Sequence, residues 1–210
     1  MPKNNLEMTC GTLSRPSKMP GFGTSIPTKY CKTGSRLAQI EGTVCSQCYA
    51  MRGNYLYEVV QNALEYRYKQ LKDPNWVDHM TKLIESKVNP RDPHFRIHDS
   101  GDWQGVWHIR NWTLVADNLQ CVRFWAPTKE TQMLSVYLKK FGPLPSNFVV
   151  RLSAYRLGER PSNAQMRLGP TSTVGASFGY KCPAPNQGNK CGNCRACWDS
   201  TVNNVDYKKK

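Results

Sequence analysis

Apolar side chains recur three and four positions apart between residues 55 and 88. The first series comprises Leu56, Val59, Val60, Ala63, Leu64 and Leu71, and the second comprises Trp76, Met80, Leu83, Ile84 and Val88. Asp73 and Pro74 lie between the two series, and a proline at such a position does not continue a helix. The pattern therefore predicts two consecutive helices.

Short apolar runs alternate with further helical patterns after residue 90. Strands are predicted at residues 94–98, 121–126 and 147–154, and helices at 107–119 and 131–141. Alternation of strand and helix is typical of a parallel sheet with right-handed crossovers. We therefore predict an α/β fold.

The ends of the chain differ in composition from its middle. Residues 1–50 are rich in Gly, Pro, Ser and Thr, which predicts irregular loop with one short strand. Residues 51–160 form the alternating core, and residues 161–210 form a C-terminal cysteine segment with a basic tail. No repeat or low-complexity linker divides the chain, and 39% hydrophobic residues suffice for one core. We predict a single domain, 1–210.

Seven of the nine cysteines fall into two groups. The first cysteine group is Cys31, Cys45 and Cys48, and the second is Cys182, Cys191, Cys194 and Cys197. An odd number of cysteines and the lack of a signal peptide argue against a disulfide framework. The spacing of the second group is typical of thiolates around one ion or cluster. Three thiolates in the first group would leave one coordination position open.

The ligand of the second cysteine group is open to three interpretations. Its four thiolates could hold an auxiliary iron-sulfur cluster or a structural zinc ion, or one of them could complete the coordination of the first cluster. Thiolates accept both zinc and iron-sulfur, and compact Cys-x-x-Cys-x-x-Cys runs occur in ferredoxin-type ligation. We favour iron-sulfur for this group.

Polar residues follow three of the predicted strands, at 98–102, 127–129 and 151–155. Ligands of parallel α/β sheets bind beyond the carboxyl ends of the strands, so these strand ends are expected to surround the first cysteine group. These strand-end residues include His98, Lys129 and Arg151. Asp99 and Asp102 also suit helix capping and a turn at Gly101. Cys121 is expected to be a small buried residue.

The chain is strongly basic. Lys and Arg total 29 against 15 Asp and Glu, which gives a formal charge of +14 and makes nucleic acid or another polyanion a possible partner. Aromatic residues alternate with basic residues at 66–69 and lie beside Arg123 at 123–125, although both stretches also suit core packing. No apolar run approaches the roughly 20 residues of a membrane span, so no membrane partner is expected.

Several segments together resemble a known family. These are SKMPG, Cys31, VCSQCYAMRGNY, FRIHDSGDW, FWAPTK, VVRLS and CGNCRACW. They resemble the phage gene product 88 family over nearly the whole chain. The Cys-x-x-Cys-Tyr-Ala loop and the strand and helix order are also distantly similar to phage three-cysteine-motif proteins that look like radical S-adenosylmethionine enzymes.

The distant resemblance implies a partial (βα) barrel with parallel strands and irregular cysteine-bearing ends. It implies a four-iron (4Fe-4S) cluster on the first cysteine group, with Tyr49, Arg52 and Tyr55 around its loop and S-adenosylmethionine at the open iron. The residues expected to meet the methionine amino group are Asp99, Ser100, Gly101 and Asp102. Two features depart from that superfamily: thirteen residues separate Cys31 from Cys45, and Gln47 replaces an aromatic.

The resulting hypothesis is a phage-encoded iron-sulfur protein of the radical S-adenosylmethionine type in the host cell cytoplasm, with a reductant partner and an unspecified substrate. The alternatives are a metal-stabilised nucleic-acid-binding protein without catalysis and a ferredoxin-like electron carrier.

Overall fold

The computed structural model describes residues 4–209 and contains one sheet of seven parallel strands. The strands are β1 (Phe22–Thr24), β2 (His94–Ile97), β3 (Arg123–Thr128), β4 (Phe148–Ser153), β5 (Thr171–Val174), β6 (Tyr180–Lys181) and β7 (Asn204–Tyr207). Their order across the sheet is β1-β2-β3-β4-β5-β7-β6, and every neighbouring pair is parallel. The predicted parallel α/β architecture is confirmed. Within residues 4–209 the sheet is open, with β1 and β6 at its edges.

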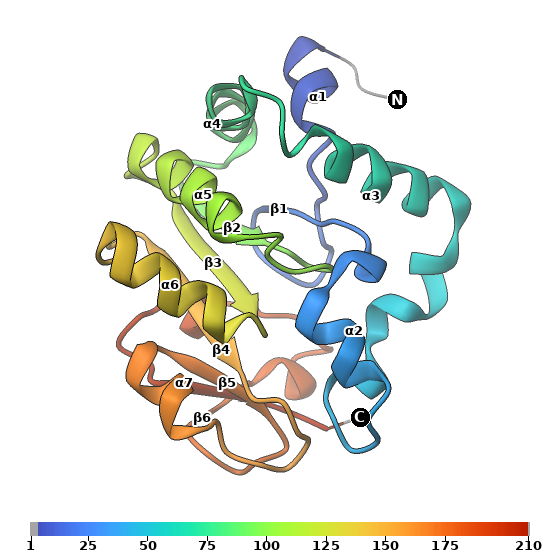
Figure 1. The fold of residues 1–210 in the computed structure, drawn as a ribbon, viewed down its shortest axis with the longest axis vertical. Helices are drawn as coiled ribbons and strands as arrows, with labels where there is room; N and C mark the ends of the chain where they lie inside the picture. Colours follow the sequence, from blue (N-terminus) through green and yellow to red (C-terminus); the bar gives the residue numbers. More distant parts are fainter. Residues whose placement is uncertain (1–3, 210) are drawn as a thin grey trace.

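Seven α-helices accompany the sheet. They are α1 (Asn5–Cys10), α2 (Lys32–Ala38), α3 (Glu58–Gln70), α4 (Trp76–Lys87), α5 (Val106–Asn118), α6 (Thr131–Phe141) and α7 (Asn163–Leu168). Figure 1 shows α4, α5 and α6 stacked along one side of the sheet, with α2 and α3 on the other side of the view. None of the described helices is long and apolar enough to cross a membrane.

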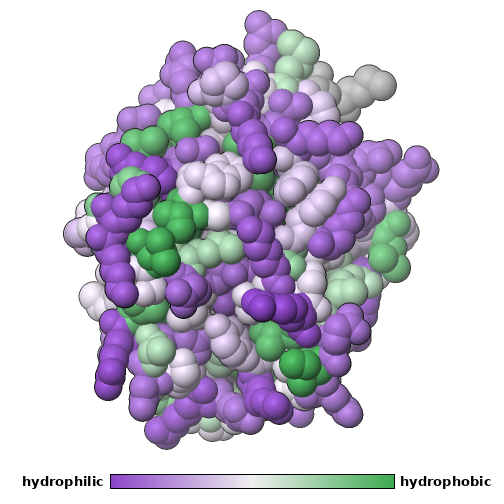
Figure 2. All heavy atoms as spheres, viewed as in Figure 1, coloured by the Kyte–Doolittle hydropathy of each residue, from purple (hydrophilic) through white to green (hydrophobic). Residues whose placement is uncertain are grey.

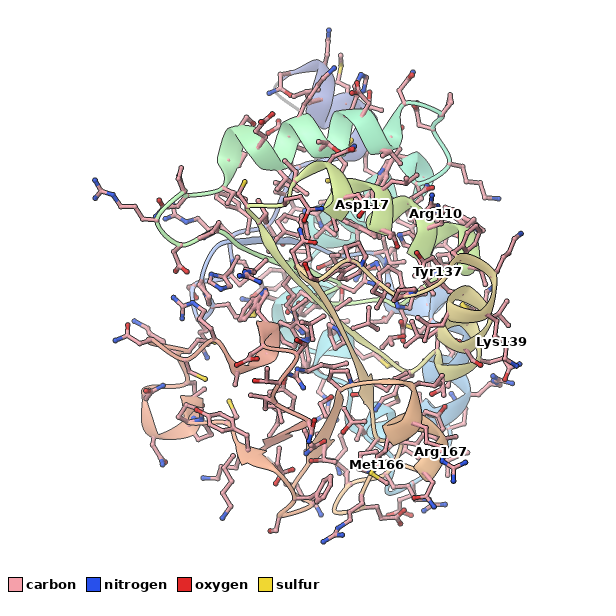
Figure 3. The ribbon with its side chains drawn as sticks, turned by 90° about the vertical axis from the view of Figure 1, so that its left-hand side faces the viewer. Arg110, Asp117, Tyr137, Lys139, Met166 and Arg167 are labelled. Atoms are coloured by element: carbon pink, nitrogen blue, oxygen red, sulfur yellow. The ribbon has the colours of Figure 1, made fainter. Side chains whose placement is uncertain are left out.

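The helical layer turns a polar surface to solvent. Figure 3 labels side chains of α5, α6 and α7 along this layer, among them Asp117, Lys139 and Arg167, which are all exposed. On the face shown in Figure 2, hydrophilic residues dominate and apolar ones form small separate groups.

The chain ends contain more regular structure than predicted. α1, β1 and α2 lie within residues 1–50, and α7, β5, β6 and β7 lie within residues 161–210, so the expectation of irregular ends was wrong. Polar pairs join β5 to β7: Thr171 Oγ1 donates to Asn204 Oδ1 at 2.8 Å, and Thr173 Oγ1 donates to Asp206 Oδ1 at 2.7 Å. A face built from such pairs has no apolar alternation by which a sequence pattern could reveal it.

Cys121 also departs from expectation. It is exposed, because β3 begins at Arg123 and Cys121 lies in the turn before it. The strand predicted at 121–126 therefore starts two residues later than its apolar pattern indicated.

The two faces of the sheet are covered by different elements. Phe95, Phe124 and Phe148 belong to the apolar core under the helices. Alternation along the strands directs the neighbouring Arg96 and Trp125 to the opposite face. There the C-terminal segment, residues 182–203, covers the sheet.

Trp198 fixes this C-terminal segment against the strands. Its ring centroid lies 5.0 Å from that of Trp125, and its Nε1 donates to the carbonyl of Phe95 at 2.9 Å. Both faces of the parallel sheet are therefore buried, as such sheets require.

Arg151 holds the same segment in place. It is fully buried, and its guanidinium donates hydrogen bonds to five carbonyl oxygens. These belong to Thr171 (3.3 Å), Ala196 (2.7 Å), Cys197 (3.0 Å), Asp199 (2.6 Å) and Val202 (2.7 Å). Arg151 lies within β4 on the face opposite the helices, so its predicted place among the strand ends around the first cysteine group was wrong.

Replacement of Arg151 should destabilise the protein severely. Arg151→Met leaves several buried carbonyl groups without a donor, and each costs about 1–3 kcal/mol, so we expect a total loss of about 3 kcal/mol or more in the free energy of unfolding. Urea denaturation measures this loss in the free energy of unfolding. Arg123→Met is the matched control, because Arg123 is exposed at the start of β3. Equal stability of the two variants would contradict the anchoring role.

Candidate metal and cofactor site

The first cysteine group lies in the loop that follows β1. Cys31 directly precedes α2, Cys45 begins a single 3-10 turn of residues 45–47, and Cys48 follows that turn. A side chain on Gly34 would place its Cβ 3.7 Å from the Sγ atoms of both Cys31 and Cys45. Cys48 is close enough to raise the pKa of both other thiols. The structure therefore brings the three predicted cysteines together.

The strand ends contact this loop, residues 31–48. Glu130, after β3, accepts from the backbone N of Thr33 at 2.7 Å and from its Oγ1 at 2.9 Å. The carbonyl of Tyr155, after β4, accepts from Val44 N at 2.9 Å. Lys32 Nζ donates at 2.9 Å to the carbonyl of Gln104, which lies after β2. The predicted meeting of strand ends and cysteine loop is confirmed.

Burial raises the pKa of two thiols of the first cysteine group. It raises the pKa of Cys31, and nearby Asp102 raises it further. Burial also raises the pKa of Cys45, while the charge of Lys129 acts in the opposite direction. Protonated thiols do not ligate metals, so a bound cation is needed to hold this group as thiolates.

Lys129 is the cation next to these thiols. Its Nζ donates to the carbonyl of Ala154, and burial lowers its pKa to about 8, against the opposing effect of Cys45 and Asp102. A buried ammonium beside a thiol pair offsets negative charge that develops there.

Asp102 connects the end of β2 to the end of β3. Its carboxylate accepts from Thr128 Oγ1 at 2.6 Å, from Lys129 N at 2.7 Å and from Trp103 N at 2.8 Å. Burial raises its pKa to about 7, although these three hydrogen bonds lower it. The carboxylate is therefore fully engaged by the protein. It does not cap α5, which follows Gly105.

Asp99 faces the segment that follows the first cysteine group. Its carboxylate forms an ion pair with Arg96 at 2.7 Å and accepts from the hydroxyl of Tyr55. Tyr49 donates to the Asp99 carbonyl, and its hydroxyl accepts from Arg96 Nη2 at 3.2 Å. Tyr49 and Tyr55 therefore bind Asp99 at the end of β2, although Tyr49 and Arg52 are both exposed, and the expected packing of these three residues around a cluster stays a prediction.

Ser100 and Gly101 complete the turn. Ser100 Oγ donates to the carbonyl of Ile26 at 3.0 Å. Gly101 has φ +84, and a Cβ there would lie 2.7 Å from the Ile26 oxygen. The four residues expected to bind a cofactor therefore join the loops after β1, β2 and β3, and their described polar contacts are with the protein. A cofactor role for them stays a prediction.

His98 was wrongly expected beside the cysteine loop. Its φ of +65 breaks the alternation at the end of β2, and its ring lies 4.7 Å from Trp103 and 5.2 Å from His108. Burial lowers its pKa to about 3, with a further contribution from Arg96. His98 is therefore a neutral side chain inside the protein.

The second cysteine group surrounds a different space. Cys182, Cys191, Cys194 and Cys197 line one pocket of about 20 Å³, together with Tyr180 and Trp198, and no residue of the first group lines it. The hydroxyls of Tyr180 and Tyr207 lie 3.6 Å from Cys194 Sγ and 3.1 Å from Cys197 Sγ.

Neither group has the geometry of a formed metal site. Within residues 4–209, no three His, Cys, Asp or Glu side chains are arranged closely enough to hold a metal ion. The cysteines of each group are neighbours, but their thiols do not converge as the ligands of one ion do. Their ligand roles stay predictions.

A cavity of about 290 Å³ lies beside residues 54 and 55, which follow the first cysteine loop, and the sequence did not reveal it. Its polar lining includes Ser25, Asn54, Tyr55, Arg67 and Asp99, and residues of α3 supply its apolar lining. The one available signal was the polar end of the VCSQCYAMRGNY segment, which contains Asn54 and Tyr55.

Gly101 provides a test of the turn after β2. Gly101→Ala should lose about 1–2 kcal/mol for the positive φ and a further 1–3 kcal/mol for overpacking against Ile26. Gly142→Ala is the control, because Gly142 has φ +83 and nothing lies within 4 Å of its added Cβ. Thermal unfolding of both variants measures the difference. Equal losses would show that the turn is not tightly packed on Ile26.

One of three comparisons with known proteins gives a match. A family model described as Gene product 88 matches residues 3–200. Comparison with curated proteins and comparison with solved structures each give no match.

Proposed function

The chain belongs to the gene product 88 family of phage proteins, and we propose that it is an iron-sulfur enzyme of the radical S-adenosylmethionine type. The observation that carries the proposal is the position of Cys31, Cys45 and Cys48. They lie in one loop beyond the carboxyl end of β1, where the loops after β2, β3 and β4 also converge. Parallel α/β proteins bind their ligands at this edge.

The sheet order supports a partial (βα) barrel. β1 to β5 follow one another in chain order with parallel pairing, as successive βα units do. The face opposite the helices carries Arg96, Trp125 and Arg151 and is covered by a single segment. That face is the interior of the proposed barrel.

The residues present suit a cluster with one open position. Three thiols belong to the first group, and the four thiols of the second group line a separate pocket. We therefore expect no fourth thiolate ligand at the first group. A cluster held there would supply one-electron chemistry, with S-adenosylmethionine as the expected cofactor at its open position. Lys129 would offset the negative charge of the thiolates.

The 290 Å³ cavity favours an enzyme over a ferredoxin-like carrier. Its volume is close to the lower limit of small-molecule sites, about 300 Å³, and an electron carrier has no need of such a space. Asp99 lines the cavity and also contacts Tyr49, the residue after Cys48. A substrate bound there would contact Asp99, which links the cavity to the segment that follows the cysteine loop.

Three of the four aromatic residues invoked for nucleic-acid binding pack against the protein. Tyr68 stacks on Tyr30 with ring centroids 3.7 Å apart, and Phe124 and Trp125 are buried. The fourth, Tyr66, is partly exposed, and its hydroxyl donates to the Met8 carbonyl at 2.6 Å. A polyanion partner stays a prediction from the +14 charge alone.

Loss of two first-group cysteines should remove the cluster. We expect anaerobically purified protein to be brown and to contain iron and acid-labile sulfide, and Cys45→Ser with Cys48→Ser to abolish the oxygen-sensitive absorption. Iron and sulfide assays with visible spectra measure this. Cys121→Ser is the control, because Cys121 is exposed and belongs to neither group. Protein that contains only zinc and no sulfide would refute the proposal.

S-adenosylmethionine should change the electron paramagnetic resonance signal of the reduced cluster. Asp99→Asn should weaken the change several-fold without removing the signal, because it replaces the carboxylate between the loop and the cavity. Asp117→Asn, on the exposed face of α5, should behave as the unmodified protein does. A normal cluster signal that saturating cofactor leaves unchanged would indicate a closed site with a fourth protein ligand.

A further inference from the structure

We propose that the second cysteine group binds a single zinc ion. The ion fixes the C-terminal segment across the face of the sheet that lies opposite the helices. This site goes beyond the proposed function, and it does not depend on a cluster at the first cysteine group.

The backbone brings the four thiols to one place. Cys182 directly follows β6, and Cys197 lies in the 3-10 turn of residues 196–198. Between them, Cys194 N donates to the Cys191 carbonyl at 3.0 Å, and Gly192 within this turn has φ +53. A tight turn of this kind directs two thiols to the same side, as paired thiolate ligands of zinc require.

The small size of the pocket favours one ion over a cluster. About 20 Å³ is room for roughly one water-sized atom, since a single water needs about 10–15 Å³ by the same measure. Zinc fits such a space with thiolates about 2.3 Å away in a tetrahedron. An iron-sulfur cube contains eight atoms and needs more room. Of the three interpretations that the sequence left open for this group, we therefore propose the structural zinc ion.

The charge around the pocket suits a tetrathiolate zinc site. Four thiolates and Zn²⁺ carry a net charge of −2, which nearby cations have to offset. The charges of Arg195 and Arg96 act on Cys191, and those of Arg151 and Arg96 act on Cys197. The hydroxyl of Tyr207 can donate to Cys197 Sγ at 3.1 Å, and such hydrogen bonds orient a thiolate that binds zinc.

The segment that carries these thiols ties together several strands. Cys191 N donates to the Lys18 carbonyl at 2.9 Å, just before β1. Arg195 forms an ion pair with Asp92 at 2.7 Å, just before β2. These contacts lie at the amino ends of the strands, whereas the first cysteine loop lies at the carboxyl ends. A zinc ion here would stabilise the fold and take no part in chemistry at the first site.

The test uses full-length protein with Cys45→Ser and Cys48→Ser, so that metal retained by this variant belongs to the second group. We expect one zinc per chain by elemental analysis and no acid-labile sulfide. Adding Cys191→Ser and Cys194→Ser should abolish zinc binding, whereas adding Cys121→Ser should leave it unchanged. Iron with sulfide in the starting variant, or no metal in it, would overturn the proposal, and either result leaves the first-site cluster to be judged from the unmodified protein.

Cobalt supplies a readout that does not require the quadruple variant to fold. The Cys45→Ser, Cys48→Ser protein is stripped with a chelator under reducing conditions and titrated with Co²⁺. We expect the intense absorption of tetrahedral cobalt thiolate to reach a plateau at one equivalent, and Zn²⁺ to displace it. Absorption that does not saturate, or that lacks the tetrahedral bands, would show that the four thiols do not share one ion.

Discussion

Parallel alignment of the strands is the constraint on which the rest of the structure depends. Because all seven strands run in one direction, every carboxyl end meets the same edge of the sheet, and the loops after β1, β2, β3 and β4 are brought together there. Glu130 and the Tyr155 carbonyl bind the cysteine loop from two of these ends. Antiparallel pairing would send alternate loops to the opposite edge and separate them.

The same alignment requires both faces of the sheet to be covered. Helices cover one face with apolar side chains, but the other face carries charged and amphipathic residues such as Arg96 and Arg151. A buried guanidinium needs acceptors on every side. The C-terminal segment supplies them as backbone carbonyls to Arg151, so this face is covered by polar contacts together with the packing of Trp198 on Trp125.

Sequence patterns predicted the elements whose apolar spacing reflects burial. Trp76, Met80, Leu83 and Ile84 of α4 are all buried as their spacing indicated. Val59, in contrast, is 73% exposed although it fits the same kind of pattern, because α3 lies outside the core. β5 and β7 gave no signal, since Thr171 and Asp206 are buried through side-chain hydrogen bonds.

The sequence predicted which residues lie in the candidate site better than it predicted where their side chains point. Spacing and cysteine type identified both groups, and strand ends identified Asp102 and Lys129. Arg151 and His98 were misplaced, because the direction of a side chain depends on strand register and on a local φ that the sequence does not reveal. Gly34, whose missing side chain leaves room beside two thiols, carries no signal until the loop is folded.

Arg96 links the two cysteine groups physically. On one side its guanidinium binds Asp99 and the hydroxyl of Tyr49, the residue after Cys48. It also lies over the ring of Trp125 at 4.7 Å, and Trp125 packs on Trp198, the residue after Cys197. The position of the first cysteine loop therefore depends on the packing of the C-terminal segment. The zinc ion that we propose would hold Trp198, Trp125 and Arg96 in place beneath the loop, so that the proposed structural site would support the proposed reactive one.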